Sequence, residues 1–329
     1  MKKTIEKQQY SVDDLKYLIE KWMGSDRVPE NFKIISDTSD FYRVEYDDVV
    51  LLDGKPYFIR NNEREGRFGI DEQQKFWVKR ARDLTDGSIK ILKLVFHERF
   101  NAKVGDITFE CFRSPKKEAR ILDITRGNNR FMQGFSVLDE SGNIIRILDF
   151  IHGKNFGDTI IRMNASHEEY YSKNFPGILD EYIELVKAIQ FLHKHSEKHG
   201  DIRRDHIIWQ KEEGRGVWID FDFNYIHKEN LFGYDLFGLG NILVFIAGGG
   251  DVTVQGLHEC NSPAINRLTA DDINIIFKNR VVNLKKVFPY ISESLNLVLM
   301  HFSASANTFY ENTQQFLDEL QESRATLGN

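Results

Sequence analysis

Alternating apolar and polar positions predict β-strands through much of the first half of the chain. Residues 75–83 read KFWVKRARD, and residues 88–96 read SIKILKLVF. Asp-Gly pairs at 53–54 and 86–87 separate neighbouring stretches, and alternation bounded by such pairs is a strong short-range signal for β-hairpins. The predicted strands are residues 41–52, 56–60, 75–83, 88–96, 131–139 and 143–150.

A helix is expected among these strands, over residues 115–126. Ser114 can cap its N-terminus, Pro115 suits the first turn, and Gly127 can end it. The first half of the chain therefore predicts a small antiparallel β lobe with one helix.

From about residue 155 onward the periodicity becomes helical. Apolar side chains from Leu179 to Leu192 recur at spacings of three and four, which places them on one helix face. Thr269 and Asp272 form a plausible capping pair for a later helix. The later helices are expected at 234–247, 270–285, 291–302 and 310–323, with strands near 207–210 and 216–223.

These patterns predict an α+β protein with two lobes. The β-rich lobe covers residues 41–150, and the larger, mainly helical lobe covers residues 151–329. Residues 1–40 form an N-terminal extension with an amphipathic helix over 11–23, which either packs on the small lobe or binds a partner.

Composition excludes several classes of protein. The net charge is −6, so the chain lacks the broad basic surface with which nucleic-acid binders displace counterions. The two cysteines, Cys111 and Cys260, are far apart and favour a reducing compartment. The longest apolar stretch, Leu236–Ala247, is too short to span a bilayer. We expect a cytoplasmic protein with neither nucleic acid nor membrane as partner.

Two aspartates carry the strongest chemical signal. Asp201 follows a long predicted helix, and Asp220 follows a short predicted hairpin. In phosphoryl transfer one carboxylate can orient the attacking hydroxyl while another holds Mg²⁺ on the phosphates.

At these residues the chain resembles the protein-kinase-like superfamily. His199-Gly200-Asp201 is similar to the catalytic-loop motif of aminoglycoside and choline kinases, and Asp220-Phe221-Asp222 stands where protein kinases have Asp-Phe-Gly. The resemblance, to a divergent bacterial-type Ser/Thr protein kinase, covers about residues 60–323. It implies a bilobal protein-kinase-like fold, ATP and Mg²⁺ as cofactors, Asp201 as the catalytic base and Asp220 as a metal ligand.

Further motifs follow in the order that the resemblance requires. Lys93 corresponds to the lysine that contacts the nucleotide phosphates, with Lys90 as the alternative. Glu118 corresponds to its ion-pair partner, with Glu110 as second choice. The glycine-rich loop over the phosphates would include Gly66, Phe68 and Gly69, although Arg64 stands at its first glycine position.

The resemblance also implies a hinge and a central helix. Residues 147–156 are similar to the hinge between lobes, where Asp149 to Ile151 would offer backbone groups to adenine behind Leu148 as gatekeeper. Asp235 opens the central helix of the large lobe and would hold the backbone of the catalytic loop.

The chain departs from the family pattern at several positions. His206 replaces the asparagine that binds the second metal, so the site would use one Mg²⁺ or accept Mn²⁺. Asp222 replaces a glycine and offers a second carboxylate for metal. Ile91 replaces a small alanine over adenine, and the short segment between Asp220 and Asp235 lacks the Ala-Pro-Glu motif. Phe309 replaces the arginine that this motif's glutamate pairs with.

Three hypotheses follow. The first is an active ATP-dependent phosphotransferase that acts on a hydroxyl of a protein Ser/Thr or of a small molecule, with Arg203 steadying the transferred phosphate. The second is a pseudokinase, a nucleotide-responsive binding module, which His206 and the irregular glycine loop favour. The third is an unrelated α/β fold with coincidental motifs.

Overall fold

The chain folds into two compact units. The computed structural model describes residues 10–67, 70–104, 107–163, 165–226 and 230–327. Unit 1 comprises Met1–Glu98, Ser114–Gly127 and Met132–Ile151, and unit 2 comprises Arg99–Arg113, Asn128–Phe131 and His152–Asn329. Unit 1 is built mainly of strands and unit 2 mainly of helices, which confirms the predicted α+β class.

The strands of unit 1 form one continuous sheet. Seven strands pair among its described residues, in the order β1-β2-β3-β4-β5-β9-β8. Only the β1–β2 pair is parallel within this sheet, and the other neighbours are antiparallel. The strands are β1 (Ile34–Ile35), β2 (Val49–Leu52), β3 (Lys55–Arg67), β4 (Ile70–Asp83), β5 (Ile89–Lys93), β8 (Gly134–Leu138) and β9 (Ile144–Asp149).

Two α-helices lie among the described residues of unit 1, and the second begins with the Ser114 cap that its sequence predicts. In α1 (Val12–Met23), Ser11 and Asp14 form a reciprocal capping box. In α2 (Pro115–Ile124), the Ser114 side chain accepts from the backbone N–H of Lys117 and Pro115 occupies the first turn. The helix packs against β9 and β8 in the same unit.

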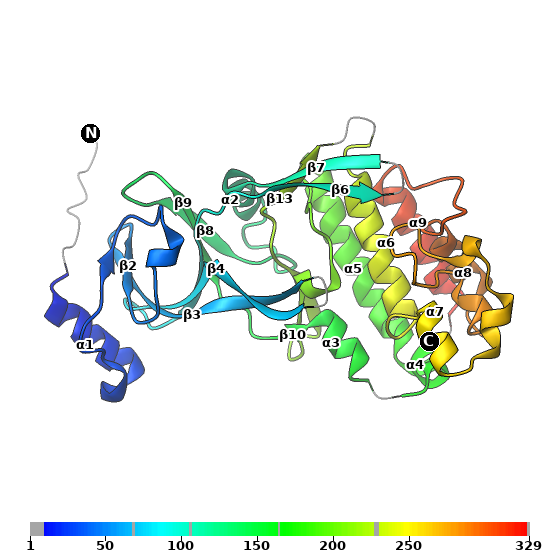
Figure 1. Cartoon of the computed structure of the whole chain (residues 1–329), viewed down its shortest axis with the longest axis horizontal. Helices are drawn as coiled ribbons and strands as arrows, with labels where there is room; N and C mark the ends of the chain where they lie inside the picture. Colours follow the sequence, from blue (N-terminus) through cyan, green and yellow to red (C-terminus); the bar gives the residue numbers. More distant parts are fainter. Residues whose placement is uncertain (1–9, 68–69, 105–106, 164, 227–229, 328–329) are drawn as a thin grey trace. The chain divides into compact units, whose positions relative to one another are not determined.

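A long central helix organises unit 2. The predicted apolar face of α5 (Phe175–Lys194), from Leu179 to Leu192, is fully buried. It lies beside α6 (Gly233–Ala247) (Figure 1). Gly240 of α6 lets Phe302 approach closely, because a Cβ there would lie 2.1 Å from its ring. The remaining helices are α3 (Phe156–Ile161), α4 (His167–Lys173), α7 (Val254–Glu259), α8 (Glu293–Met300) and α9 (Thr313–Ala325).

Unit 2 also contains two small sheets among its described residues, β10-β11-β12 and β13-β7-β6. In the second sheet, a hairpin that precedes α2 in the sequence pairs through β7 with the strand that follows Asp222. The strands are β6 (Arg99–Val104), β7 (Ile107–Arg113), β10 (Lys154–Asn155), β11 (Ile207–Gln210), β12 (Arg215–Trp218) and β13 (Phe223–Ile226).

The prediction of a helix at 270–285 is wrong. Its capping box is present, yet it closes only one 3₁₀ turn, Ala270–Asp272. The Asn274 side chain accepts from the backbone N–H groups of Ile276 and Phe277, so it takes donors that a helix would need. The backbone of Asp272 instead accepts from Val282 and Asn283.

The strand expected at 41–52 is shorter than predicted. Residues Phe41–Arg43 form a 3₁₀ turn capped by the Asp40 side chain, and the strand itself spans only Val49–Leu52. The buried Asp48 carboxylate accepts from the backbone N–H groups of Lys33 and Glu45, which turns the chain before the strand begins.

No helix in the described ranges combines the length and the apolar character needed to cross a membrane.

Candidate functional site

In unit 1, Lys93 and Glu118 form a buried ion pair. Lys93 Nζ lies 2.7 Å from Glu118 Oε1, and the two side chains are 5% and 0% exposed. The other carboxylate oxygen, Oε2, accepts from Arg146 Nε at 3.0 Å. Lys93 and Arg146 are direct cross-strand partners on β5 and β9. One carboxylate from α2 therefore binds two neighbouring cations of the sheet, and this holds the Lys93 side chain in place.

The alternative candidates for this pair lie elsewhere. Lys90 Nζ binds Asp149 Oδ1 at 2.6 Å across the same two strands. Glu110 belongs to the hairpin of unit 2, where it pairs with Arg99 on the exposed surface at 3.3 Å. The structure thus brings together Lys93 and Glu118 and places both second choices in other ion pairs.

The expected hinge residues lie at the end of the last segment of unit 1. Leu148 is buried and faces Ile91 across β5 and β9. The backbone N–H of Asp149 donates to the Gln133 carbonyl at 2.9 Å, so this strand end is held by its neighbour. Ile151 is the last residue of the unit.

The expected glycine-rich loop is described only in part. Gly66 lies in β3, where the β3–β4 register is irregular between Glu65 and Arg67. Phe68 and Gly69 lie outside the described residues.

In unit 2, His206 lies against both aspartates. Its Nδ1 is 2.8 Å from the Asp201 carbonyl oxygen and 3.7 Å from Asp201 Oδ2. Its Nε2 is 3.5 Å from Asp220 Oδ2. Because a carbonyl oxygen only accepts, the short contact places a hydrogen on Nδ1 and leaves Nε2 as the nitrogen that faces Asp220. Asp220 has a φ of 68°, a left-handed conformation that is uncommon for a residue other than glycine.

Asp235 holds the loop that carries Asp201. Its carboxylate accepts from the backbone N–H groups of His199 at 2.8 Å and Gly200 at 2.9 Å, and from His193 Nε2 at 3.0 Å. Burial alone would raise the pKa of Asp235, but the hydrogen bond and charge of His193 and the Gly200 N–H outweigh it, and the pKa is lowered. This is the backbone contact that the resemblance implies for Asp235.

Arg203 is oriented by a neighbouring carboxylate. Its guanidinium binds both oxygens of Asp205, through Nε at 3.0 Å and through Nη2. Its Nη1 lies 4.0 Å from Asp201 Oδ2. Burial works against ionisation of Asp205, yet the Arg203 hydrogen bond and the charges of His206 and Arg203 lower its pKa. Arg203 is thus fixed next to the carboxylate of Asp201.

Asp222 forms a buried ion pair with Arg113. Arg113 Nη1 lies 2.7 Å from Asp222 Oδ1, and the two side chains are 1% and 2% exposed. Asp222 and Asp220 therefore lie in different surroundings, since the carboxylate of Asp220 faces His206 and that of Asp222 faces an arginine.

The donors present suit a metal that arrives with a nucleotide. Among the described residues there is no group of three or more His, Cys, Asp or Glu side chains arranged as a metal site. Mg²⁺ in nucleotide sites commonly takes one or two carboxylates and completes its shell with phosphates and water. The Asp220 carboxylate, with His206 Nε2 beside it, fits that requirement.

Sequence reasoning missed three residues that hold the candidate residues in place: Arg113, Arg146 and His193. Arg146 is charged yet stands within the apolar strand run IIRILD, and a charge in a buried strand indicates a paired group. Arg113 and His193 carry no comparable local signal, because their partners are 109 and 42 residues away.

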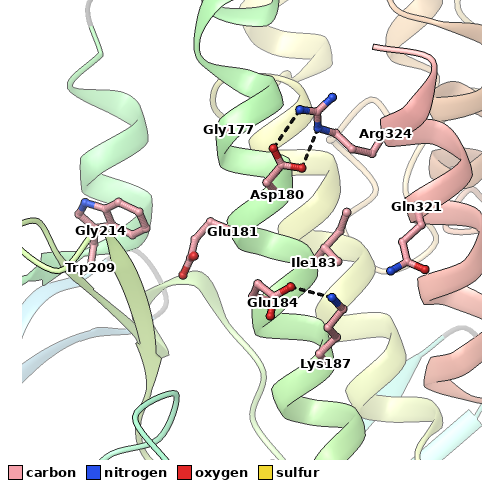
Figure 2. Close-up of a pocket in the computed structure, with 10 residues that line it drawn as sticks. All are labelled: Gly177, Asp180, Glu181, Ile183, Glu184, Lys187, Trp209, Gly214, Gln321 and Arg324. Carbon is pink, nitrogen blue, oxygen red and sulfur yellow. Dashed lines mark hydrogen bonds and ion pairs between the residues drawn. The ribbon is translucent and has the colours of Figure 1, made fainter. Parts of the chain in front are cut away.

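A separate pocket of about 450 Å³ opens beside α5 in unit 2 (Figure 2). Arg324 binds both oxygens of Asp180 there, at 2.7 and 2.9 Å, and Lys187 pairs with Glu184 at 2.7 Å. None of the candidate catalytic or metal residues lines it.

The chain has a protein-kinase-like fold, as predicted. It is similar to the kinase PK-1 of Cydia pomonella granulovirus, with a TM-score of 0.50 and 12% identity over 80% of this chain and 93% of that one. It is also similar to the kinase domain of PknI from Mycobacterium tuberculosis, with a TM-score of 0.47 and 13% identity over 81% and 96% of the two chains. No protein-family model matches the sequence. At these identities the likeness shows the fold alone.

Proposed function

We propose that this protein is an ATP-dependent and divalent-metal-dependent phosphotransferase that transfers the γ-phosphate of ATP to a hydroxyl group. The hydroxyl belongs to a protein Ser/Thr or to a small molecule. The proposal rests on the protein-kinase-like fold together with the chemistry of the residues described above.

The carboxylate of Asp201 orients the acceptor hydroxyl and takes its proton as the new oxygen–phosphorus bond forms, while the bond between the γ-phosphorus and the bridging oxygen breaks and ADP leaves. Arg203, held by Asp205, steadies the transferred phosphate. Asp220, with His206 beside it, would hold the divalent metal, and a metal bound there would neutralise charge on the phosphates.

In unit 1, Lys93 contributes a compact cation for the nucleotide phosphates, and Glu118 keeps it oriented. Backbone groups from Asp149 to Ile151 are the candidates for adenine, behind Leu148. Gly66, Phe68 and Gly69 belong to the loop proposed to cover the phosphates.

One observation carries the proposal. His206 contacts Asp201 through one ring nitrogen and Asp220 through the other, on a loop whose backbone is fixed by Asp235. A base and a metal-binding carboxylate, held together by a rigid loop, form the arrangement that phosphoryl transfer requires.

The test combines binding and turnover on the purified chain. Thermal unfolding is measured with ATP alone, with ATP and Mg²⁺, and with ATP and Mn²⁺, for wild type, Asp220→Ala and Asp201→Asn. Ligand at a hundred times its dissociation constant stabilises a fold by about 2.7 kcal/mol, a rise in melting temperature of about 4–6 °C for about 200–330 residues. We expect a metal-dependent shift that Asp220→Ala removes and Asp201→Asn retains.

Turnover separates the two aspartates. Release of ADP in the presence of candidate hydroxyl acceptors should be lost in Asp201→Asn, which still binds ATP. Lys93→Met should lose the ATP shift, whereas Lys90→Met, which breaks a partly exposed pair with Asp149, should keep it. A wild-type chain that neither binds nor consumes ATP with any metal would overturn the proposal.

A second candidate function is a pseudokinase that binds a nucleotide without transferring phosphate. The identity of residue 206 favours it, because the imidazole of His206 stands where protein kinases place a metal-binding asparagine. Metal-dependent ATP binding without turnover in wild type would select this candidate, and turnover that disappears in Asp201→Asn would exclude it.

A further inference from the structure

The segment that follows Asp220 is tied to a hairpin from a distant part of the sequence. In the β13–β7 pairing, Phe223 stands opposite Arg113, the last residue of the hairpin. The guanidinium of Arg113 binds the carboxylate of Asp222 at 2.7 Å and lies over the Phe223 ring at 3.9 Å from its centroid. Phe100, from the other strand of the hairpin, packs edge-on against Phe223 at 5.6 Å.

This environment differs from the one that a metal ligand needs. The Asp222 side chain is 2% exposed and Arg113 is 1% exposed, so both charges are removed from water and bind each other there. An arginine guanidinium binds a carboxylate strongly and directionally, and a cation would have to compete with it. Asp220, two residues earlier, carries the more accessible carboxylate, at 10% exposure.

We propose that Asp222 is an anchor and not a metal ligand, and that Arg113 is the positioning residue that fixes the Asp220–Asp222 segment through it. The inference rests on the proposed function for the role of Asp220 and replaces the sequence expectation that Asp222 adds a second carboxylate to the metal. The strand pairing and the ion pair together order the segment after Asp220 within unit 2.

The anchor can be tested without any nucleotide. Hydrogen exchange of the β13 amides, Phe223–Ile226, is compared between wild type, Arg113→Met and Asp222→Asn. We expect exchange about tenfold faster in both variants, because each removes one member of the buried ion pair and favours local opening. Arg113→Lys should recover part of the protection, since it restores the charge but not the planar fork.

The matched control lies in the same hairpin. Arg99 pairs with Glu110 at 3.3 Å, and the two side chains are 78% and 51% exposed. Arg99→Met should leave β13 exchange at the wild-type rate. If Arg113→Met and Arg99→Met behave alike, Arg113 anchors nothing and the proposal is overturned.

A measurement of metal binding distinguishes an anchoring role of Asp222 from a metal-ligand role. Mn²⁺ affinity in the presence of ATP is measured for the same variants. An anchor predicts that Arg113→Met and Asp222→Asn weaken Mn²⁺ binding together, by about 10–100-fold, as outer-shell substitutions do. A ligand predicts opposite results, with affinity lost in Asp222→Asn and kept or increased in Arg113→Met, and that outcome would overturn the proposal.

Two further outcomes remain decisive. If either single variant fails to fold, the double variant Arg113→Met/Asp222→Leu replaces the pair with apolar groups, and near wild-type Mn²⁺ affinity in it excludes a ligand role for Asp222. If wild type binds no Mn²⁺–ATP, the proposed function fails, and the exchange rates alone decide whether Arg113 is the anchor.

Discussion

Lys93 and Arg146 stand directly opposite each other on β5 and β9, two cations side by side in the interior of unit 1. Like charges in directly opposed positions destabilise a sheet. Glu118 from α2 relieves the repulsion by binding both, at 2.7 and 3.0 Å. The helix is therefore attached to the sheet by charge as well as by packing, and the lysine keeps one orientation.

Substitution of the shared carboxylate should be far more costly than substitution of a surface one. Glu118→Gln removes the carboxylate charge that Lys93 and Arg146 share, and we expect the free energy of unfolding to fall by about 3–5 kcal/mol. Lys93→Met should cost less, because Glu118 keeps Arg146 as its partner. Urea unfolding of both variants measures these differences.

The control for Glu118 lies on the same helix. Asp123 pairs with Arg126 at 2.7 Å, and both side chains are more than two-thirds exposed, at 68% and 69%. Surface pairs of this kind contribute little, so Asp123→Asn should show no measurable change. Equal losses in Glu118→Gln and Asp123→Asn would mean that the buried charges are stabilised in another way.

Local rules were sufficient for the elements that position the candidate site. The Ser114 cap, the Pro115 first turn and the apolar face of α5 follow from spacing alone, and the structure has all three. The role of Asp235 could also be predicted from the sequence, because its position at the start of a helix after the second aspartate matches the resemblance.

Contacts between residues far apart in the sequence could not be predicted from local patterns. The Arg113–Asp222 pair joins residues 109 positions apart, and it depends on the pairing of β7 with β13, which periodicity does not reveal. The prediction of a helix at 270–285 was wrong for a local reason. Asn274 captures nearby backbone donors with its side chain, so a tertiary loop replaces a helix whose capping box is intact.

The buried Asp235 makes the stability of unit 2 sensitive to acid. Its pKa is lowered in the folded chain because the hydrogen bonds and charge of His193 and the Gly200 N–H outweigh the effect of burial. The native carboxyl therefore binds a proton more weakly than the unfolded one does. Its contribution is fully present above the ordinary aspartate pKa of about 3.9 and is lost as pH falls through the lower native pKa.

We accordingly expect Asp235→Asn to be less stable at neutral pH and less sensitive to acid. Each hydrogen bond weakened at a buried backbone donor costs about 1–3 kcal/mol. If the proposed phosphotransfer function holds, displacement of the Asp201 loop lowers turnover by about 100-fold. Urea unfolding between about pH 6 and pH 3 tests the expected difference in acid sensitivity between wild type and Asp235→Asn. A variant whose stability falls with acid as steeply as that of wild type would assign the acid sensitivity to other carboxylates.

A buried lysine predicts a pH dependence of the same sign at alkaline pH. Lys79 Nζ donates to the Val44 carbonyl at 2.6 Å and to Asn62 Oδ1 at 2.9 Å, and burial lowers its pKa to about 8. An unfolded lysine titrates near about 10.4. Between these values the unfolded chain holds a proton that the native chain has released, so the free energy of unfolding should rise with pH.

Lys79→Met removes this titration. We expect the wild-type gain in stability between about pH 8 and pH 9.5 to be absent in the variant, as measured by urea unfolding at several pH values. Lys173→Met, which alters an exposed lysine paired with Glu169 on α4, should keep the wild-type dependence on pH. If Lys79→Met keeps it as well, Lys79 is charged in the native state throughout this range.

The N-terminal helix is a structural part of unit 1. Leu15 and Ile19 of α1 are fully buried and pack in one cluster with Val49 and Phe58 of the sheet. The Trp22 indole also donates to the Leu84 carbonyl at 3.0 Å. Leu15→Ala should lower the free energy of unfolding by about 2–5 kcal/mol, because it opens a cavity between the helix and the sheet.

The comparison that decides this prediction is Tyr17→Ala on the same helix. Tyr17 is 67% exposed, so its removal should leave unfolding unchanged. If α1 instead served only to bind a partner, neither substitution would change the stability of the isolated chain, and Tyr17→Ala would be the variant that weakens capture of that partner. A large loss in Leu15→Ala with none in Tyr17→Ala therefore establishes α1 as part of the fold.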